Sequence, residues 1–279
     1  MPYLQGISAV GLDFSRDGKW VAYSSYPEGN LWRSRTDGRQ KQQLTWPGLS
    51  VAMPRWSPDR TRIAFLDETP GKPRKAYIVS AGGDNLQEIA PEEQIECSLS
   101  WSLDGNSVLF GRRAGPKGDA AAVEIGVLDL QTKRVSSLPR SSGFCEARWP
   151  PDGRYIAALR EVGPKDVDAA LTRSLVLYDF ADQKWTDLSV NPNAGFPNWS
   201  GDSKYVFFDG SPDTADAAFY RVRISDRKLE QLASHNEVKA VITVSGLMNG
   251  WTGLAPDGSP LITREVDADE VYAFDVQWP

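Results

Sequence analysis

The chain has 279 residues, of which 41% are hydrophobic and 24% charged, with a formal net charge of -6. This composition is typical of a soluble globular protein with one large domain or two small ones. The acidic balance argues against a nucleic-acid surface, which needs a clustered basic face. No apolar run approaches the roughly 18 residues of a membrane span. We therefore expect this domain to bind no nucleic acid and to enter no membrane.

A repeated pattern organises the chain: an aromatic residue, a short polar turn with Asp, and an apolar run. The repeat Asp is Asp17, Asp59, Asp104, Asp152, Asp202 and Asp257. Three residues earlier stand Phe14, Trp56, Trp101, Trp149, Trp199 and Leu254, and the position four residues after each Asp is apolar in all six copies. A period of about 40 to 50 residues with strand-like content is typical of propellers.

Each repeat contains four short strand patterns separated by turns. In the first repeat they cover residues 12–14, 20–24, 31–35 and 42–45, and Asp17-Gly18 favours a tight turn between the first two. The second repeat has its outer strands at 77–79 and 86–89. The third strands of repeats three to five are predicted at 125–130, 175–180 and 219–224, and the fourth at 135–138, 185–188 and 229–232. No window shows a convincing helical period, so helix should be minor.

The sixth repeat lacks one strand, because its third strand at 271–275 is followed by the end of the chain at Pro279. Residues 2–7 have no partner of their own, and pairing them with the last sheet would close a ring without an exposed edge. We therefore predict an all-β, six-bladed propeller of four-stranded antiparallel blades, closed by the N-terminal strand. It forms one domain over residues 1–279, with blades near 8–45, 51–90, 96–138, 144–188, 194–232 and 249–279 plus 2–7.

The motif Trp56-Ser57-Pro58-Asp59 followed by Ile63-Ala64-Phe65, with its five counterparts, resembles the PD40 (WD40-like) repeat of TolB-type propellers. The resemblance covers essentially the whole chain. Segments 6–9, 26–34 and 220–226 more narrowly resemble bacterial, notably acidobacterial, propellers that follow a winged-helix domain or a Ser/Thr kinase domain and a membrane segment. This resemblance implies a sensor or protein-interaction module of a larger, extracytoplasmic regulator. Residues 1–6 show no signal peptide, and the early first repeat suggests a chain cut from a longer protein.

The sequence favours binding over catalysis. One active site does not need six copies of an Asp, so we expect the repeat Asp to cap turn N–H groups and the aromatic residue to pack between sheets. His235, the only histidine, has no identifiable nucleophile or orienting partner, and we expect it in a surface loop. We predict no metal site and no cofactor, because there is neither a multi-His set nor a phosphate loop.

The two cysteines, Cys97 and Cys145, each stand four residues before their repeat Trp. They should lie at the same level on the inner strands of adjacent blades. Inner strands that diverge from the axis would place their Cα atoms beyond the ~7 Å limit for a disulfide. We therefore expect two buried free thiols, and a bridge stays open if the domain is extracytoplasmic.

A binding site is predicted at the channel mouth, three residues before each repeat aromatic. That position is Gly11, Met53, Ser98, Glu146, Phe196 and Trp251. The candidate contacts are Trp251, Phe196 and Met53 for apolar surface, Glu96 and Glu146 for charge, and Trp46 in a neighbouring loop. The other interpretation is that these side chains only pack the inner strands.

The predicted function is a binding, sensor or scaffold module, expected to be monomeric, that recognises a protein, peptide or small ligand. The alternative is a hydrolase or lyase with Glu96 and Glu146 as acid and base.

Overall fold

The computed structural model describes residues 8–113, 123–162, 172–188, 193–210, 217–234 and 252–262. All secondary-structure elements in these ranges are strands. They form five four-stranded antiparallel sheets and one two-stranded sheet. In the described ranges there is no helix with the length and apolar character needed to cross a bilayer.

The five four-stranded sheets are the blades, and each corresponds to one sequence repeat. Blade 1 contains β1 (Ala9–Phe14), β2 (Trp20–Ser25), β3 (Leu31–Arg35) and β4 (Gln42–Gln43). Blade 2 contains β5 (Val51–Trp56), β6 (Arg62–Asp67), β7 (Lys75–Ser80) and β8 (Gln87–Ile89). Blade 3 contains β9 (Ile95–Trp101), β10 (Ser107–Arg113), β11 (Val123–Asp129) and β12 (Val135–Ser137). Blade 4 contains β13 (Phe144–Arg148), β14 (Tyr155–Val162), β15 (Thr172–Asp179) and β16 (Lys184–Asp187). Blade 5 contains β17 (Gly195–Trp199), β18 (Tyr205–Gly210), β19 (Ala218–Arg223) and β20 (Leu229–Ser234).

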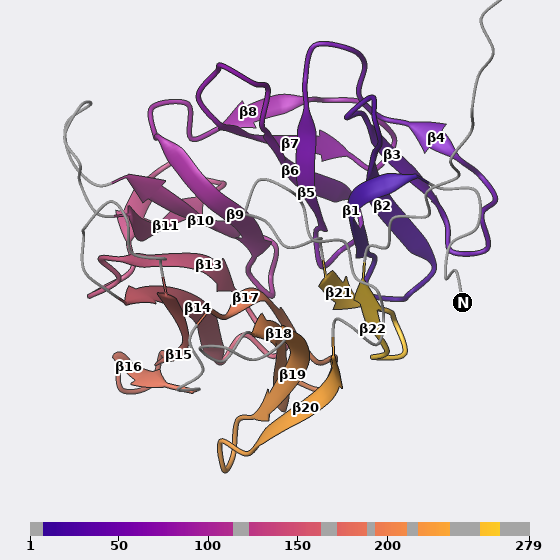
Figure 1. The fold of residues 1–279 in the computed structure, drawn as a ribbon. Coiled ribbons are helices and arrows are strands. Elements are labelled where there is room, and N and C mark those ends of the chain that lie inside the picture. Colours follow the sequence, from indigo (N-terminus) through magenta and orange to yellow (C-terminus); the bar gives the residue numbers. More distant parts are fainter. Residues whose placement is uncertain are drawn as a thin grey trace, which may run out of the picture.

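Each blade is a meander in which strands that are consecutive in sequence pair with one another. The first strands β1, β5, β9, β13 and β17 contact each other in succession and form the inner wall of the propeller (Figure 1). The fourth strands lie at the outer edge. The predicted strand content of the first five repeats is confirmed, with bounds that differ by a few residues.

The predicted number of blades is wrong, because the part of the chain that the structure describes forms five four-stranded blades rather than six. The described part of the sixth repeat forms only a hairpin of β21 (Thr252–Leu254) and β22 (Pro260–Ile262). This hairpin lies between blade 5 and blade 1, where β21 contacts both β17 and β1 (Figure 1). Two three-residue strands do not make a four-stranded blade. The segments predicted to complete it, 2–7 and 271–275, lie outside the described residues.

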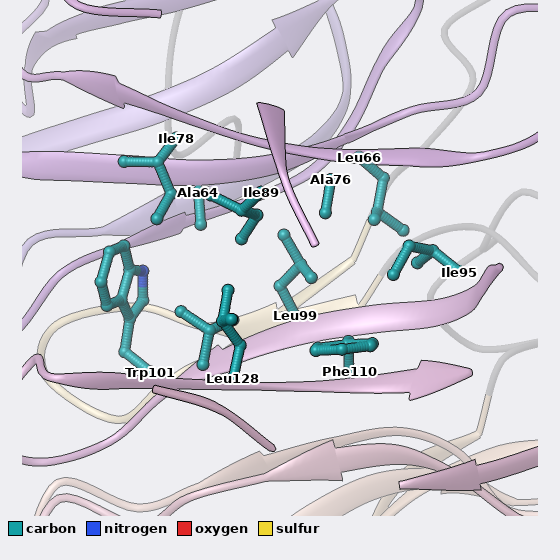
Figure 2. Close-up of a cluster of buried hydrophobic side chains, with 11 residues drawn as sticks. Ala64, Leu66, Ala76, Ile78, Ile89, Ile95, Leu99, Trp101, Phe110 and Leu128 are labelled. Carbon is teal, nitrogen blue, oxygen red and sulfur yellow. The ribbon is translucent and has the colours of Figure 1, made fainter. Parts of the chain in front are cut away.

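The hydrophobic core consists of four clusters, and each lies between two neighbouring blades. The cluster in Figure 2 joins Leu66 and Ile78 of blade 2 to Leu99, Trp101 and Phe110 of blade 3. Phe110 and Leu99 are fully buried. Burying a side chain of this size stabilises the fold by about 1.5–3 kcal/mol. The blade faces that meet in these clusters are therefore apolar, and the inner strands contribute to them as well as carrying polar side chains.

The repeat Asp holds the turn between the first two strands of a blade. In blade 1, Ser15 Oγ donates to Asp17 Oδ1 at 2.7 Å, and the Lys19 N–H donates to the same oxygen at 3.2 Å. The same pair of bonds recurs at Asp59, Asp104 and Asp202. The prediction that these carboxylates are structural is confirmed.

Candidate functional site in the central channel

Polar side chains occupy the same position on the inner strand of all five blades, directly before the repeat aromatic residue. They are Asp13, Arg55, Ser100, Arg148 and Asn198. We call these five residues the channel ring. Alternation along a strand points every second residue to the same side, so the sheets present this position to the channel while the aromatic residue packs between blades.

A cavity of about 240 Å³ opens at the channel ring. All five ring residues line it, together with Arg16 at its rim. Its walls are the repeat aromatics and the turns that follow them: Trp56, Pro58, Trp101, Ser102, Leu103, Trp149, Pro150, Pro151 and Trp199. Every blade therefore contributes a polar group, and blades 2 to 5 also contribute apolar surface, to one concave site, which is the usual composition of a ligand pocket.

Among the described residues that line the cavity, Asp13 is the only carboxylate. Its Oδ2 accepts a hydrogen bond from the Trp56 N–H at 2.7 Å, and its Oδ1 lies 3.9 Å from Arg55 Nη1. Burial raises the pKa of Asp13 above its ordinary value, while Arg55, the Trp56 N–H and Arg148 act in the opposite direction. Asp13 thus fixes blade 1 to blade 2 and balances part of the positive charge of the ring.

Arg148 is a buried cation held by an extensive network. Its Nη1 donates to Ser98 Oγ at 2.6 Å and to the Leu99 carbonyl at 3.1 Å, and its Nη2 lies 3.4 Å from Glu146 Oε2. Burial, followed by repulsion from Arg55, lowers the pKa of Arg148 to about 9. The guanidinium remains charged at neutral pH, so its positive charge lies near that of Arg55, with Glu146 and Asp13 as the respective acidic neighbours.

The predicted contacts Met53, Glu146 and Phe196 lie on the inner strands, two residues before the channel ring. All three adopt a left-handed backbone conformation, with φ of 49°, 52° and 49°. Each lies in a β-bulge, where the pairing of the inner strand with its neighbour shifts register. Such conformations cost about 1–3 kcal/mol each for residues other than glycine. The three are therefore equivalent, strained positions on the inner strands of blades 2, 4 and 5. None of them lines the cavity, although Glu146 lies 3.4 Å from Arg148, which does.

The other predicted contacts are dispersed. Glu96 Oε1 accepts from Arg113 Nε at 2.9 Å, which ties it to the neighbouring strand. Trp46 is 62% exposed in the connection after blade 1. Trp251 and His235 lie outside the described residues. Glu146 accepts from Ser98 Oγ at 2.5 Å, so its carboxylate also joins blades 3 and 4.

The prediction of two free thiols is wrong, because Cys97 and Cys145 form a disulfide between blades 3 and 4. Their Cα atoms are 5.9 Å apart, within the usual range for a bridge. The inner strands β9 and β13 converge at the channel instead of diverging. Gly111 pairs with Cys97, and a Cβ at Gly111 would stand 2.6 Å from Cys97 Sγ, so the glycine leaves room for the bridge. Disulfide sulfurs are not thiolate ligands, although Glu146 lies beside them.

Sequence reasoning missed the channel ring, although a signal was present. The position before the repeat aromatic is polar in five of six copies, next to strongly apolar strands. The β-bulge between this position and the predicted one, three before the aromatic residue, interrupts the simple alternation of a strand. The position predicted to bind, three residues before the aromatic residue, carries the more varied residue types. The channel ring, one residue before the aromatic residue, carries more of the charged side chains.

No family model matches the chain. Two curated proteins match part of it. One is the "Uncharacterized peptidase YuxL" of Bacillus subtilis, 27% identical over 112 residues, which are 37% of this chain and 17% of that protein. The other is the "Uncharacterized protein Atu1656" of Agrobacterium fabrum, 25% identical over 114 residues, 37% of this chain and 39% of that protein. The match thus spans less than half the length of either curated relative.

Solved structures match far more of the chain. TolB from Acinetobacter baumannii has a TM-score of 0.65 at 20% identity, over 88% of this chain and 55% of that one. A putative TolB from Agrobacterium tumefaciens has a TM-score of 0.64 at 17% identity, over 90% and 87%. An oligogalacturonate lyase in complex with manganese has a TM-score of 0.60 at 15% identity, over 95% and 80%. Identities this low show the fold, and the repeat motif agrees with it: the chain has the fold of the TolB-like, PD40-type β-propellers.

Proposed function

We propose that this chain is a non-catalytic binding module that receives a peptide segment of a partner protein in its central channel. The observation that supports this function most is the cavity at the channel ring, to which all five blades contribute. Rigid strands hold its polar groups, and tryptophan and proline side chains line its walls. Such a site binds by shape and by a few fixed polar contacts, and it needs no reacting group.

The bridged inner strands support the same proposal. The disulfide, the Ser98–Glu146 hydrogen bond and the Arg148 network all join blade 3 to blade 4 beside the cavity. A site held this firmly before binding loses little conformational entropy when a ligand enters. The role as a sensor or scaffold of a larger bacterial regulator, proposed from the resemblance, extends this binding function.

The proposal is tested by selecting peptides from a displayed random library on the immobilised full chain. The affinities of the selected peptides are then measured for Leu103→Ala, which truncates a 42% exposed side chain at the cavity, and for Leu86→Ala as a control. Leu86 is 47% exposed and lies outside the cavity lining. We expect Leu103→Ala to weaken binding at least about fivefold and Leu86→Ala to leave it unchanged. Equal effects of the two variants would contradict a channel site.

The predicted contacts at the bulges define a second surface for the same test. Phe196→Ala alters a side chain outside the cavity lining on the inner strand of blade 5. If the selected peptides depend on Phe196 and not on Leu103, the partner binds at the surface formed by Met53, Glu146 and Phe196 instead. That surface, with Glu96, Trp46 and Trp251, is the proposed extension of the site.

The catalytic alternative is examined with the same protein. Structural neighbours include the oligogalacturonate lyase, so the chain is incubated with oligogalacturonate, with and without Mn²⁺, and with chromogenic peptide substrates. Turnover that is abolished by Glu146→Gln would favour a lyase or hydrolase and would overturn the binding-only proposal. The melting temperature of Glu146→Gln is measured alongside, because Glu146 also joins two blades.

A further inference from the structure

Arg55 is a largely covered cation whose hydrogen-bonding capacity is mostly unused. Its side chain is only 11% exposed. Among the described residues, its Nη1 donates to the Pro54 carbonyl at 3.2 Å, while its Nε and Nη2 have no hydrogen-bond partner. Asp13 is 3.9 Å from Nη1, which is an ion pair without a hydrogen bond. A guanidinium has five N–H donors, and those of Arg55 that no described protein group accepts remain available to a ligand.

Arg148 provides a second, fixed positive charge beside Arg55. Its burial is nearly complete, and its Nε has no hydrogen-bond partner among the described residues. The repulsion between the two guanidinium groups contributes to the lowered pKa of Arg148. Arg16, at the rim of the cavity, forms no salt bridge with any residue that the structure describes. Among the described residues, the cavity lining thus holds three arginines and one carboxylate, Asp13, while Glu146 pairs with Arg148 just outside the lining, in a protein whose overall charge is negative.

We propose that the cavity binds a carboxylate, specifically the side chain of an acidic residue in an extended peptide segment. This inference rests on the proposed binding function and adds the chemistry of the ligand. The planar fork of Arg55 matches the two oxygens of a carboxylate, and the low exposure of the site strengthens the interaction. The carboxylate enters between Arg55 and Arg148 and offsets their mutual repulsion.

The walls of the cavity explain why a peptide is the better fit than a free inorganic anion. Trp101, Trp149, Pro150 and Pro151 present flat apolar surfaces around the arginines. Such surfaces bury the aliphatic stem of an acidic side chain and the backbone next to it. The volume of about 240 Å³ accommodates a side chain and part of its backbone rather than a folded domain.

The experiment uses two tripeptides that differ only in charge: N-acetyl-Gly-Glu-Gly-amide and N-acetyl-Gly-Gln-Gly-amide. Binding to the full chain is followed by NMR through the indole N–H signals of tryptophan. The signals of Trp56, Trp101, Trp149 and Trp199 report on the cavity, and that of Trp46 serves as a remote control. We expect the Glu peptide to shift the four cavity signals in a saturable manner and the Gln peptide to bind at least about tenfold more weakly.

Arg55→Gln is the decisive variant, because Arg55 has few contacts and its replacement should leave the fold intact. Arg55→Gln should weaken binding of the Glu peptide about tenfold or more and remove the preference for the Glu over the Gln peptide. Arg55→Lys should retain part of this preference. Arg39→Gln, which changes an 83% exposed arginine, is the matched control and should have no effect. An unchanged preference in Arg55→Gln, or inorganic phosphate that displaces the Glu peptide at equal concentration, would overturn the proposal.

Failure of this inference differs from failure of the binding function. If the binding of the selected peptides depends on Leu103 but not on Arg55, the proposed carboxylate ligand is wrong, whereas the proposed binding site in the channel is retained. Loss of the Leu103 dependence itself would overturn both. A direct readout of stability, urea unfolding of Arg55→Gln, separates loss of binding from loss of fold.

Discussion

Reduction of the Cys97–Cys145 disulfide should lower the free energy of unfolding by about 4 kcal/mol. The bridge joins residues separated by 48 positions in the sequence. Closing a loop of this length in the unfolded chain reduces its entropy, and this reduction corresponds to about 4 kcal/mol at room temperature. The cross-linked loop includes β10, β11 and β12, so the bridge restrains most of blade 3 and the start of blade 4.

The measurement is urea unfolding followed by tryptophan fluorescence, with and without a strong reductant. The reduced protein should unfold at a lower urea concentration. Cys97→Ala/Cys145→Ala is the control: it should match the reduced protein closely, and the reductant should not change it further. The comparison separates the cross-link from any general effect of the reductant.

A decrease of less than about 1 kcal/mol on reduction would refute this reasoning. It would show that the unfolded chain already restrains the loop between the cysteines, because the entropic effect acts through the unfolded state. A large decrease in the reduced protein but not in the double alanine variant would instead indicate damage elsewhere. Either outcome is visible in the same set of unfolding curves.

The turn motif leads to two more predictions. A hydrogen bond from Ser15 lowers the pKa of Asp17 from 3.8 to about 2. The ionised Asp17 carboxylate therefore stabilises the fold at pH values above 3.8, and this stabilisation is lost as the pH falls through the folded-state pKa of about 2. Asp17→Asn should flatten the decrease in stability between about pH 4 and about pH 2 in urea unfolding; an unchanged slope would contradict this. Gly258→Ala, at φ +84° in open space, should cost about 1 kcal/mol. Gly18→Ala, at φ +66°, should lower the free energy of unfolding by more than Gly258→Ala does, because its Cβ would lie 2.7 Å from Pro256 Cβ. Equal losses in the two variants would exclude the contact between residue 18 and Pro256.

The strained bulges bear on how the channel is used. Met53, Glu146 and Phe196 are equivalent in the repeat and share the left-handed conformation. Strain of this kind persists only where surrounding structure imposes it, and it is common at functional positions. In this protein the bulges shift the register of the inner strands just before the channel ring. They thereby set the direction in which Arg55, Arg148 and Asn198 leave their strands.

Local chemistry made the blades predictable. The bonds from a Ser hydroxyl and a backbone N–H to the repeat Asp span only a few residues, so the residue types and their spacing reveal them directly. The apolar run after each turn is equally local, because a strand buried on both faces needs it. Strand positions, the antiparallel blades and the structural role of the repeat Asp therefore followed from the sequence alone.

Distances between blades had to come from the tertiary structure. The number of complete blades depends on how far each inner strand turns around the axis, which no single repeat encodes. The rotation from one blade to the next also brings Cys97 within bonding distance of Cys145, 48 residues away in the sequence, and places Asp13 beside Arg55. The sequence by itself determined which residues form a blade, whereas the packing of blade on blade decided which polar side chains meet in the channel. Packing between blades acts over long sequence separations, and that is why the cavity emerged only in three dimensions.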